Sequence, residues 1–115
     1  MNSMVYISLA VNILVLIPII VLMLLRSPII DTAWGSYSQA RGILMSIYFA
    51  ILVVSILLLF RPAPEFVFAL LLVQVIYKVT TPLTVGIKNP VVISNLFIAA
   101  LHVITLVTLF PAIEL

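Results

Sequence analysis

The chain has 115 residues, of which 66% are hydrophobic and only 7% are charged, whereas a soluble domain carries roughly 25% charged residues. A core of this size cannot hide so much apolar surface, so the composition excludes an ordinary soluble domain and predicts one small domain in a lipid bilayer. The net charge of +2 is too small and scattered to suggest nucleic-acid binding, and the absence of cysteine excludes disulfides and cysteine-ligated iron–sulfur clusters.

Four continuous apolar segments are long enough to cross a hydrocarbon core of about 30 Å, which needs about 20 helical residues. The predicted helices cover residues about 4–26, 41–60, 66–86 and 91–110 of a single membrane domain. Pro18 is expected to kink the first helix, and the sequences RPAP and KNP interrupt the later ones. These runs lack the alternation of a membrane β-barrel. The predicted fold class is therefore an all-α membrane protein, a four-transmembrane-helix antiparallel bundle.

Charge placement predicts the orientation of the helices. Four of the five cations lie in two regions, from Arg26 to Arg41 and from Lys78 to Lys88, whereas the opposite side has Arg61. The positive-inside rule assigns the first group to the cytoplasm, so both termini are expected on the non-cytoplasmic side of the cytoplasmic (inner) membrane. The first helix is expected to remain in the protein and not to be cleaved as a signal peptide, because MNSMVY lacks the lysine or arginine that precedes the apolar core of such a peptide.

The first loop, SPIIDTAWGSYSQA, is predicted to form a short element on the membrane surface. Asp31 is expected to cap a turn through the sequence TAW. Trp34 and Tyr37 are typical of the headgroup layer, so they are predicted to be interfacial anchors. A lipid-facing role for this loop is favoured over a role as a binding site.

Polar side chains in the last two predicted helices fall at matching depths. A helix rises about 1.5 Å per residue, which puts Gln74 level with His102 and Lys78 closer to Asn95. Gln74 and Lys78 share one helix face, as do Asn95 and His102. We therefore predict that the two helices pack with these stripes facing each other inside the protein. Asn12 of the first helix is expected to lie at about the same depth as Gln74.

Three interpretations of Lys78 are open. Its long side chain could snorkel to the cytoplasmic headgroups, it could pair with Asp31, the one acid on the predicted cytoplasmic side, or it could bind a ligand or ion. Pro82 cannot donate a hydrogen bond to the carbonyl of Lys78. Thr80 and Thr81 are close enough to satisfy the broken turn.

His102 is the only histidine in the chain. A haem ligand, a quinone hydrogen-bond donor or a proton relay would use such a residue. The alternative is a neutral imidazole that is hydrogen-bonded across a helix interface, for instance to Gln74. The sequence predicts no cofactor outright, although haem or a quinone would fit, and no metal site unless His102 binds haem.

No predicted span contains an acidic residue, which argues against a proton-coupled or cation-coupled antiporter. The chain resembles the small multidrug resistance transporters in length and helix count alone. Its first helix has no glutamate, so their mechanism is not expected to carry over. The sequence also lacks HExxH and a glycine-rich phosphate loop, so enzymatic activity is not expected.

The predicted function is a small non-catalytic integral membrane protein, an accessory or structural subunit of a larger membrane complex. Its partners would be the lipid bilayer and either other membrane subunits or further copies of itself. An alternative is a binding or transport module for a quinone, lipid or anion that uses Lys78, Gln74, Asn95 and His102. A haem-b anchor through His102 is the second alternative.

Overall fold

The computed structural model of the chain describes residues 2–113, and over this range it is all-helical, with five α-helices. Four of them are long: α1 (Ser3–Leu24), α3 (Gln39–Phe60), α4 (Pro64–Thr84) and α5 (Pro90–Leu109). The short α2 (Pro28–Trp34) connects α1 to α3, and a 3-10 turn, η1 (Phe110–Ala112), follows α5. The four long helices are long and apolar enough to cross a membrane. The predicted all-α class and its four candidate spans are therefore confirmed.

The helices begin where the sequence supplies capping residues. Ser38 Oγ accepts a hydrogen bond from Arg41 N at 3.2 Å at the start of α3, and Asn89 Oδ1 accepts one from Val91 N at 2.8 Å at the start of α5. Pro90 occupies the first turn of α5, where its missing N–H would be unpaired in any case. The KNP sequence therefore starts α5 as well as ending the loop before it.

Ser27, rather than the predicted Asp31, caps the short helix α2. Its Oγ accepts a hydrogen bond from Ile29 N at 3.3 Å, and Pro28 is the first residue of the helix. Asp31 lies inside α2, so its carboxylate is available to a neighbouring helix. Gly35 follows α2 with a φ of +83°, a conformation that side-chain-bearing residues rarely adopt. This glycine lets the chain leave α2 and turn toward α3.

Two prolines lie inside long helices without ending them: α1 continues through Pro18, and α4 continues through Pro82. Since Pro82 has no N–H to donate, the carbonyl of Lys78 accepts a hydrogen bond from Thr81 Oγ1 at 2.7 Å. The prediction that a threonine hydroxyl satisfies this turn is confirmed.

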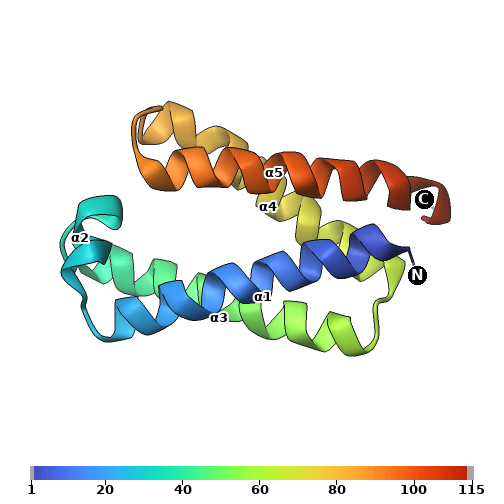
Figure 1. Cartoon of the computed structure of the whole chain (residues 1–115), viewed down its shortest axis with the longest axis horizontal. Helices are drawn as coiled ribbons and strands as arrows, with labels where there is room; N and C mark the ends of the chain where they lie inside the picture. Colours follow the sequence, from blue (N-terminus) through green and yellow to red (C-terminus); the bar gives the residue numbers. More distant parts are fainter. Residues whose placement is uncertain (1, 114–115) are drawn as a thin grey trace.

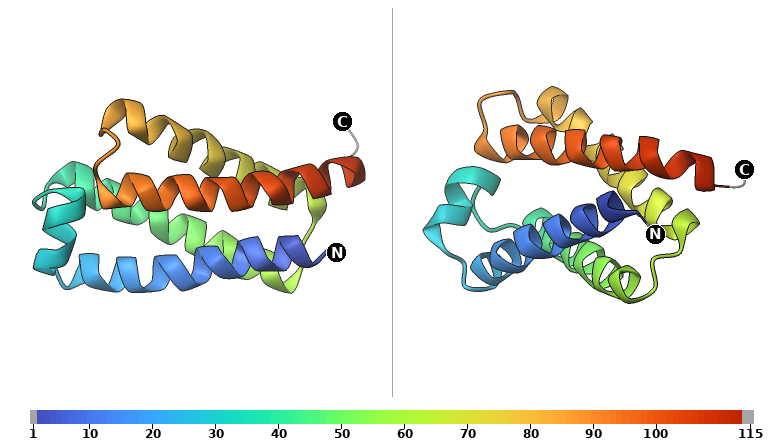
Figure 2. Two further views of the ribbon diagram at one scale, coloured as in Figure 1. Left: turned by 45° about the horizontal axis from the view of Figure 1, so that its top comes forward. Right: turned by 45° about the vertical axis from the view of Figure 1, so that its right-hand side comes forward.

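The long helices form two pairs, α1 against α3 and α4 against α5, and the pairs meet mainly where α1 contacts α5 (Figure 1). The start of α1 and the end of α5 lie at one end of the molecule, here called the terminal end (Figure 1 and Figure 2). Helix α2 and the α4–α5 connection lie at the other, here called the α2 end. The longest dimension is 43 Å, which matches a bilayer of about 40–45 Å with its headgroups.

Large apolar side chains cover the outer surface as well as filling the interior. Leu9 and Leu71 are fully buried toward the terminal end, and Ile30 is buried at the α2 end. By contrast, Leu83 is 87% exposed and Phe60 is 80% exposed. In water this surface would drive aggregation, but lipid tails are as apolar as leucine and solvate it without cost.

Candidate functional site

Buried polar side chains gather in two separate regions of the bundle. The first, which we call the polar network, draws on α1, α3 and α5 and consists of Ser8, Asn12, Ser55, His102 and Thr105. The second, which we call the Lys78 cavity, lies at the α2 end and is bordered by all five helices. The two regions differ in whether their polar groups are satisfied by the protein itself.

In the polar network, His102 is fully buried, and both of its ring nitrogens have partners on α1. Nδ1 lies 3.0 Å from Ser8 Oγ, and Nε2 lies 2.9 Å from Asn12 Oδ1. Ser8 and Asn12 are four residues apart and so share one face of α1. Asn12 Nδ2 donates to Ser55 Oγ on α3 at 3.1 Å, and Ser8 Oγ lies 2.6 Å from Thr105 Oγ1. These bonds join three helices at one level.

The direction of each bond in the network follows from Asn12. Because Asn12 Nδ2 donates to Ser55, its Oδ1 is the acceptor, and His102 Nε2–H is the donor. In a neutral imidazole, Nδ1 then accepts from the Ser8 hydroxyl. The single hydroxyl proton of Thr105 has three acceptors in reach, namely Ser8 Oγ at 2.6 Å and the carbonyls of Met4 and Leu101, each at 3.2 Å. The imidazole therefore has no free position for a further ligand.

The structure corrects one expectation for His102. Its partners are Ser8 and Asn12 and not Gln74, whereas Asn12 lies at the level of His102, as the depth of the two residues predicts. Gln74 is buried as predicted, at 1% exposed, but Nε2 donates to Leu70 O of its own helix at 3.4 Å. A haem iron at His102 would have to replace one of the two hydrogen bonds that the ring nitrogens make here. Within residues 2–113, no three metal-ligating side chains gather into a cluster.

The Lys78 cavity lies where α1 and α5 face each other at the α2 end, and its volume is about 300 Å³. A second cavity of about 480 Å³ adjoins it, and Trp34, Tyr48 and Asn95 line both. These volumes fall within the range of roughly 300–1,000 Å³ that is usual for small-molecule sites. The apolar walls of the first cavity include Val15, Leu16 and Ile19 of α1, Ile29 of α2 and Ile98 of α5.

Lys78 borders the first cavity, and its side chain is only 7% exposed. Within residues 2–113, no hydrogen bond or ion pair engages its ammonium group. The centroid of the Tyr77 ring lies 5.5 Å from Nζ, where a cation–π contact contributes about 0.5–2 kcal/mol but supplies no counter-charge. The side chain of Lys78 thus lines a cavity among the helices instead of lying on the outer surface of the bundle.

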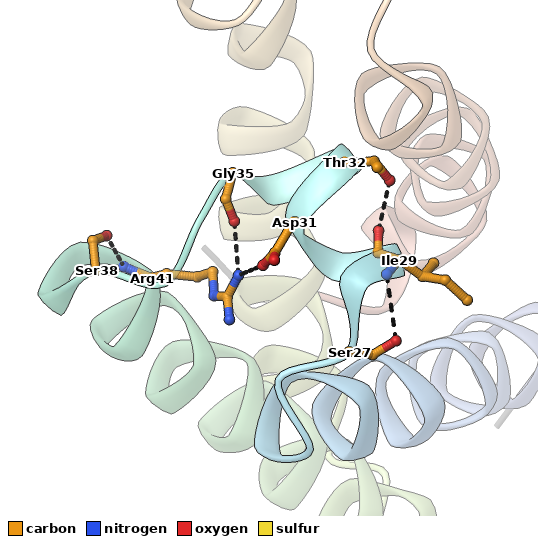
Figure 3. Close-up of polar contacts among 7 residues, drawn as sticks. All are labelled: Ser27, Ile29, Asp31, Thr32, Gly35, Ser38 and Arg41. Atoms are coloured by element: carbon orange, nitrogen blue, oxygen red, sulfur yellow. Dashed lines mark hydrogen bonds and ion pairs between the residues drawn. The ribbon is translucent and has the colours of Figure 1, made fainter.

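Asp31 pairs with Arg41 of α3 rather than with Lys78 (Figure 3). Arg41 Nη1 lies 2.5 Å from Asp31 Oδ1 and also donates to Gly35 O at 2.7 Å. The planar guanidinium stands beside the end of α2, so it reaches a carboxylate and a terminal carbonyl together. Glu65, the other acid in the described part of the chain, lies about 20 Å from Lys78 along α4. Neither carboxylate neutralises Lys78.

Five further polar side chains line the Lys78 cavity: Thr32, Trp34, Tyr48, Ser94 and Asn95. Trp34 Nε1 donates to the Tyr48 hydroxyl at 3.2 Å, which leaves the hydroxyl proton of Tyr48 available to another acceptor. Asn95 is 7% exposed, and its Nδ2 lies 3.5 Å from Thr81 Oγ1, at the limit of a hydrogen bond. Lys78 and Asn95, which the sequence puts at neighbouring depths, thus line one cavity.

The two predicted interfacial anchors have different surroundings. Tyr37 is 53% exposed, and its ring centroid lies 3.9 Å from Arg26 Cζ and 5.5 Å from Arg41 Cζ. Trp34 instead packs against the apolar cluster that contains Tyr48, and it lines both cavities. Trp34 is therefore part of the wall of the candidate site, a position that the lipid-facing prediction did not include.

Sequence reasoning missed Ser8, Ser55, Thr105, Tyr48 and Arg41 as polar contributors. The sequence spacing could have identified two of them. Ser8 lies four residues before Asn12, and Thr105 lies three residues after His102, so each shares a helix face with a polar residue that the sequence already singles out. Tyr48 gave no local signal, since its hydroxyl meets Trp34 only through the fold of α2 onto α3.

Comparison of the chain with known protein families, with characterised proteins and with solved structures gave no match.

Proposed function

We propose that this protein is a non-catalytic, multi-pass membrane protein that binds a small ligand in the Lys78 cavity. The observation that carries the proposal is Lys78, whose side chain is 7% exposed and borders a ligand-sized cavity, and whose ammonium group has no counter-charge in the described part of the chain. An ion that is largely removed from water and lacks a counter-charge is costly. A ligand that brings an acceptor or a negative charge offsets that cost.

Two observations favour a ligand role for Lys78 over the competing interpretations. A snorkelling lysine would expose its ammonium, but the side chain is buried. A structural ion pair would use Asp31, but that carboxylate is bound to Arg41. The remaining interpretation is a ligand role, and ionisable residues inside membrane segments commonly mark such sites.

The orientation that we propose follows the charge distribution. The helices would cross the membrane in alternating directions, with the α2 end in the cytoplasm and both termini outside, because Arg26, Arg41, Lys78 and Lys88 belong to the α2 end. The chain has no cysteine, so single cysteines report topology cleanly. Lys88→Cys should be protected from an impermeant thiol reagent in intact cells and Arg61→Cys labelled. The reverse pattern would refute this orientation.

Native mass spectrometry of the protein released from its own membranes tests the ligand role. The wild type and the Lys88→Met control should carry a bound molecule of the same mass, because Lys88 is exposed and lines neither cavity. Lys78→Met should lose that molecule. Equal occupancy in all three proteins, or none in the wild type, would contradict the proposal.

The interpretation as an accessory subunit of a larger complex is a second proposal, supported by the small residues on the open face of α3. Ser46 and Ala50, which follow Gly42 at four-residue spacing, are exposed and would allow another helix to approach closely. The same mass measurement under mild detergent distinguishes the two ideas. A stoichiometric partner chain would support the subunit role, and a monomer in native membrane extracts would count against it.

A further inference from the structure

The chemistry of the Lys78 cavity restricts what it can hold. Its one charged wall group is the ammonium of Lys78, which has three N–H donors, and the Tyr48 hydroxyl proton is also available. Asp31 lines only the neighbouring cavity, where Arg41 already neutralises it. A ligand group with oxygen acceptors and negative charge would satisfy both donors, and charge-assisted hydrogen bonds of this kind are the strongest that a site can offer.

The remaining walls favour a ligand with an apolar portion. Val15, Ile19 and Ile98 are partly buried and border the cavity with hydrocarbon alone. The cavity follows α5 from Pro90 to Ile98, a distance of about 12 Å. A free inorganic anion would occupy the part near Lys78 and leave the part lined by Val15, Ile19 and Ile98 empty or wet. An acyl chain would cover it.

The surroundings also indicate how such a ligand would arrive. The apolar cavity walls belong to α1 and α5, two of the four candidate membrane spans. Ile29 of α2 lines the cavity and is 67% exposed, so the cavity borders the outer surface at that residue. A molecule dissolved in the bilayer would reach the cavity from this exposed side, past Ile29.

We infer that the Lys78 cavity binds a membrane-borne amphiphile with an oxyanion headgroup, a carboxylate or a phosphate, with the headgroup at Lys78 and Tyr48 and the acyl chain between α1 and α5. This inference rests on the proposed ligand-binding function and narrows its ligand class. A quinone would offer only neutral carbonyl oxygens, which do not supply the missing counter-charge of Lys78.

Trp34 provides a direct assay, because it is the only tryptophan in the chain and lines the cavity. The protein is placed in nanodiscs of phosphatidylcholine, and dibrominated stearate, whose bromines quench tryptophan on contact, is titrated in. Dibrominated stearyl alcohol is the uncharged match. Oleoyl lysophosphatidate, inorganic phosphate and decylubiquinone are then added as competitors.

We expect saturable quenching by dibrominated stearate, with an affinity at least tenfold higher than that of dibrominated stearyl alcohol. Lysophosphatidate should compete with the stearate, and inorganic phosphate should not. Lys78→Met should abolish the saturable part, Tyr48→Phe should weaken it several-fold without loss of fold, and Lys88→Met should leave it unchanged. Equal affinity for acid and alcohol, or competition by inorganic phosphate alone, would overturn the inference. If decylubiquinone alone competes in a Lys78-dependent manner, the ligand class is wrong while the proposed binding function stands.

Discussion

The polar network and the Lys78 cavity contain similar kinds of side chain but differ in how the protein treats them. In the polar network, the ring nitrogens of His102 lie 2.9 and 3.0 Å from their partners. At the α2 end, Lys78 is almost as deeply buried, yet its ammonium has no partner within residues 2–113. The first arrangement holds helices together. The second leaves its interactions to be completed by another molecule.

Burial alone therefore does not distinguish a structural polar residue from a ligand-binding one. The difference is whether the buried polar groups have hydrogen-bonding partners within the protein. A network in which every group has a partner stabilises the fold, whereas a buried group without one destabilises it until a ligand binds. Substitutions in the two regions should therefore have opposite effects on the stability of the ligand-free protein.

The largest expected effect is that of His102→Ala. The change leaves Ser8 and Asn12 without their imidazole partner in the bundle interior and opens a cavity, which should cost about 3 kcal/mol of unfolding free energy. Titration with sodium dodecyl sulfate in dodecyl maltoside micelles measures it. Phe97→Ala, which truncates a ring on the outer side of the same helix at 74% exposure, should cost much less. Equal costs for the two variants would mean that the network is not structural.

The next effect concerns the ion pair. Asp31→Asn should destabilise the protein by about 1–2 kcal/mol, because it removes the counter-charge of a nearly buried guanidinium, with a discount for the half-exposed carboxylate. Glu65→Gln on the exposed start of α4 is the matched control and should change little. If instead Asp31→Asn abolished binding in the Trp34 assay while stability was kept, Asp31 would serve Lys78 rather than Arg41.

A smaller effect is expected at the proline inside α4. Thr81→Val removes the hydroxyl that satisfies the Lys78 carbonyl and should cost about 1 kcal/mol. Thr80→Val is the control, because Thr80 Oγ1 donates at 2.8 Å to Tyr77 O, a carbonyl that the backbone N–H of Thr81 can also reach. Adding Pro82→Ala should reduce the difference between the two threonines to what the 3.5 Å contact between Asn95 Nδ2 and Thr81 Oγ1 contributes. A difference that stays unchanged without the proline would refute this explanation.

The sequence predicts well those features that depend on one helix at a time. The lengths of the apolar segments predict the four spans. The rise per residue of a helix predicts that Gln74 and His102 lie deep in the bundle. The missing N–H of Pro82 predicts the role of Thr81. Each of these follows from periodicity or backbone chemistry, which operates within one segment.

The partners across helices could not be predicted, because depth fixes the height of a side chain but not the direction in which it points. His102 turns toward α1, where Ser8 and Asn12 match both ring nitrogens, rather than toward Gln74. Asp31 turns toward Arg41 because α2 is a helix capped by Ser27. The cavity depends on how α1, α2 and α5 meet in space, which no local pattern records.

The unfolding free energy of delipidated Lys78→Met, beside the wild type and Lys88→Met, tests the central claim most directly. If the buried ammonium of Lys78 awaits a ligand, replacing it with an apolar side chain of similar length removes an unpaired charge and leaves the ligand-free protein equally stable or more stable. A destabilisation comparable to that of His102→Ala would contradict the claim, because Lys78 would then be held by interactions within the protein itself.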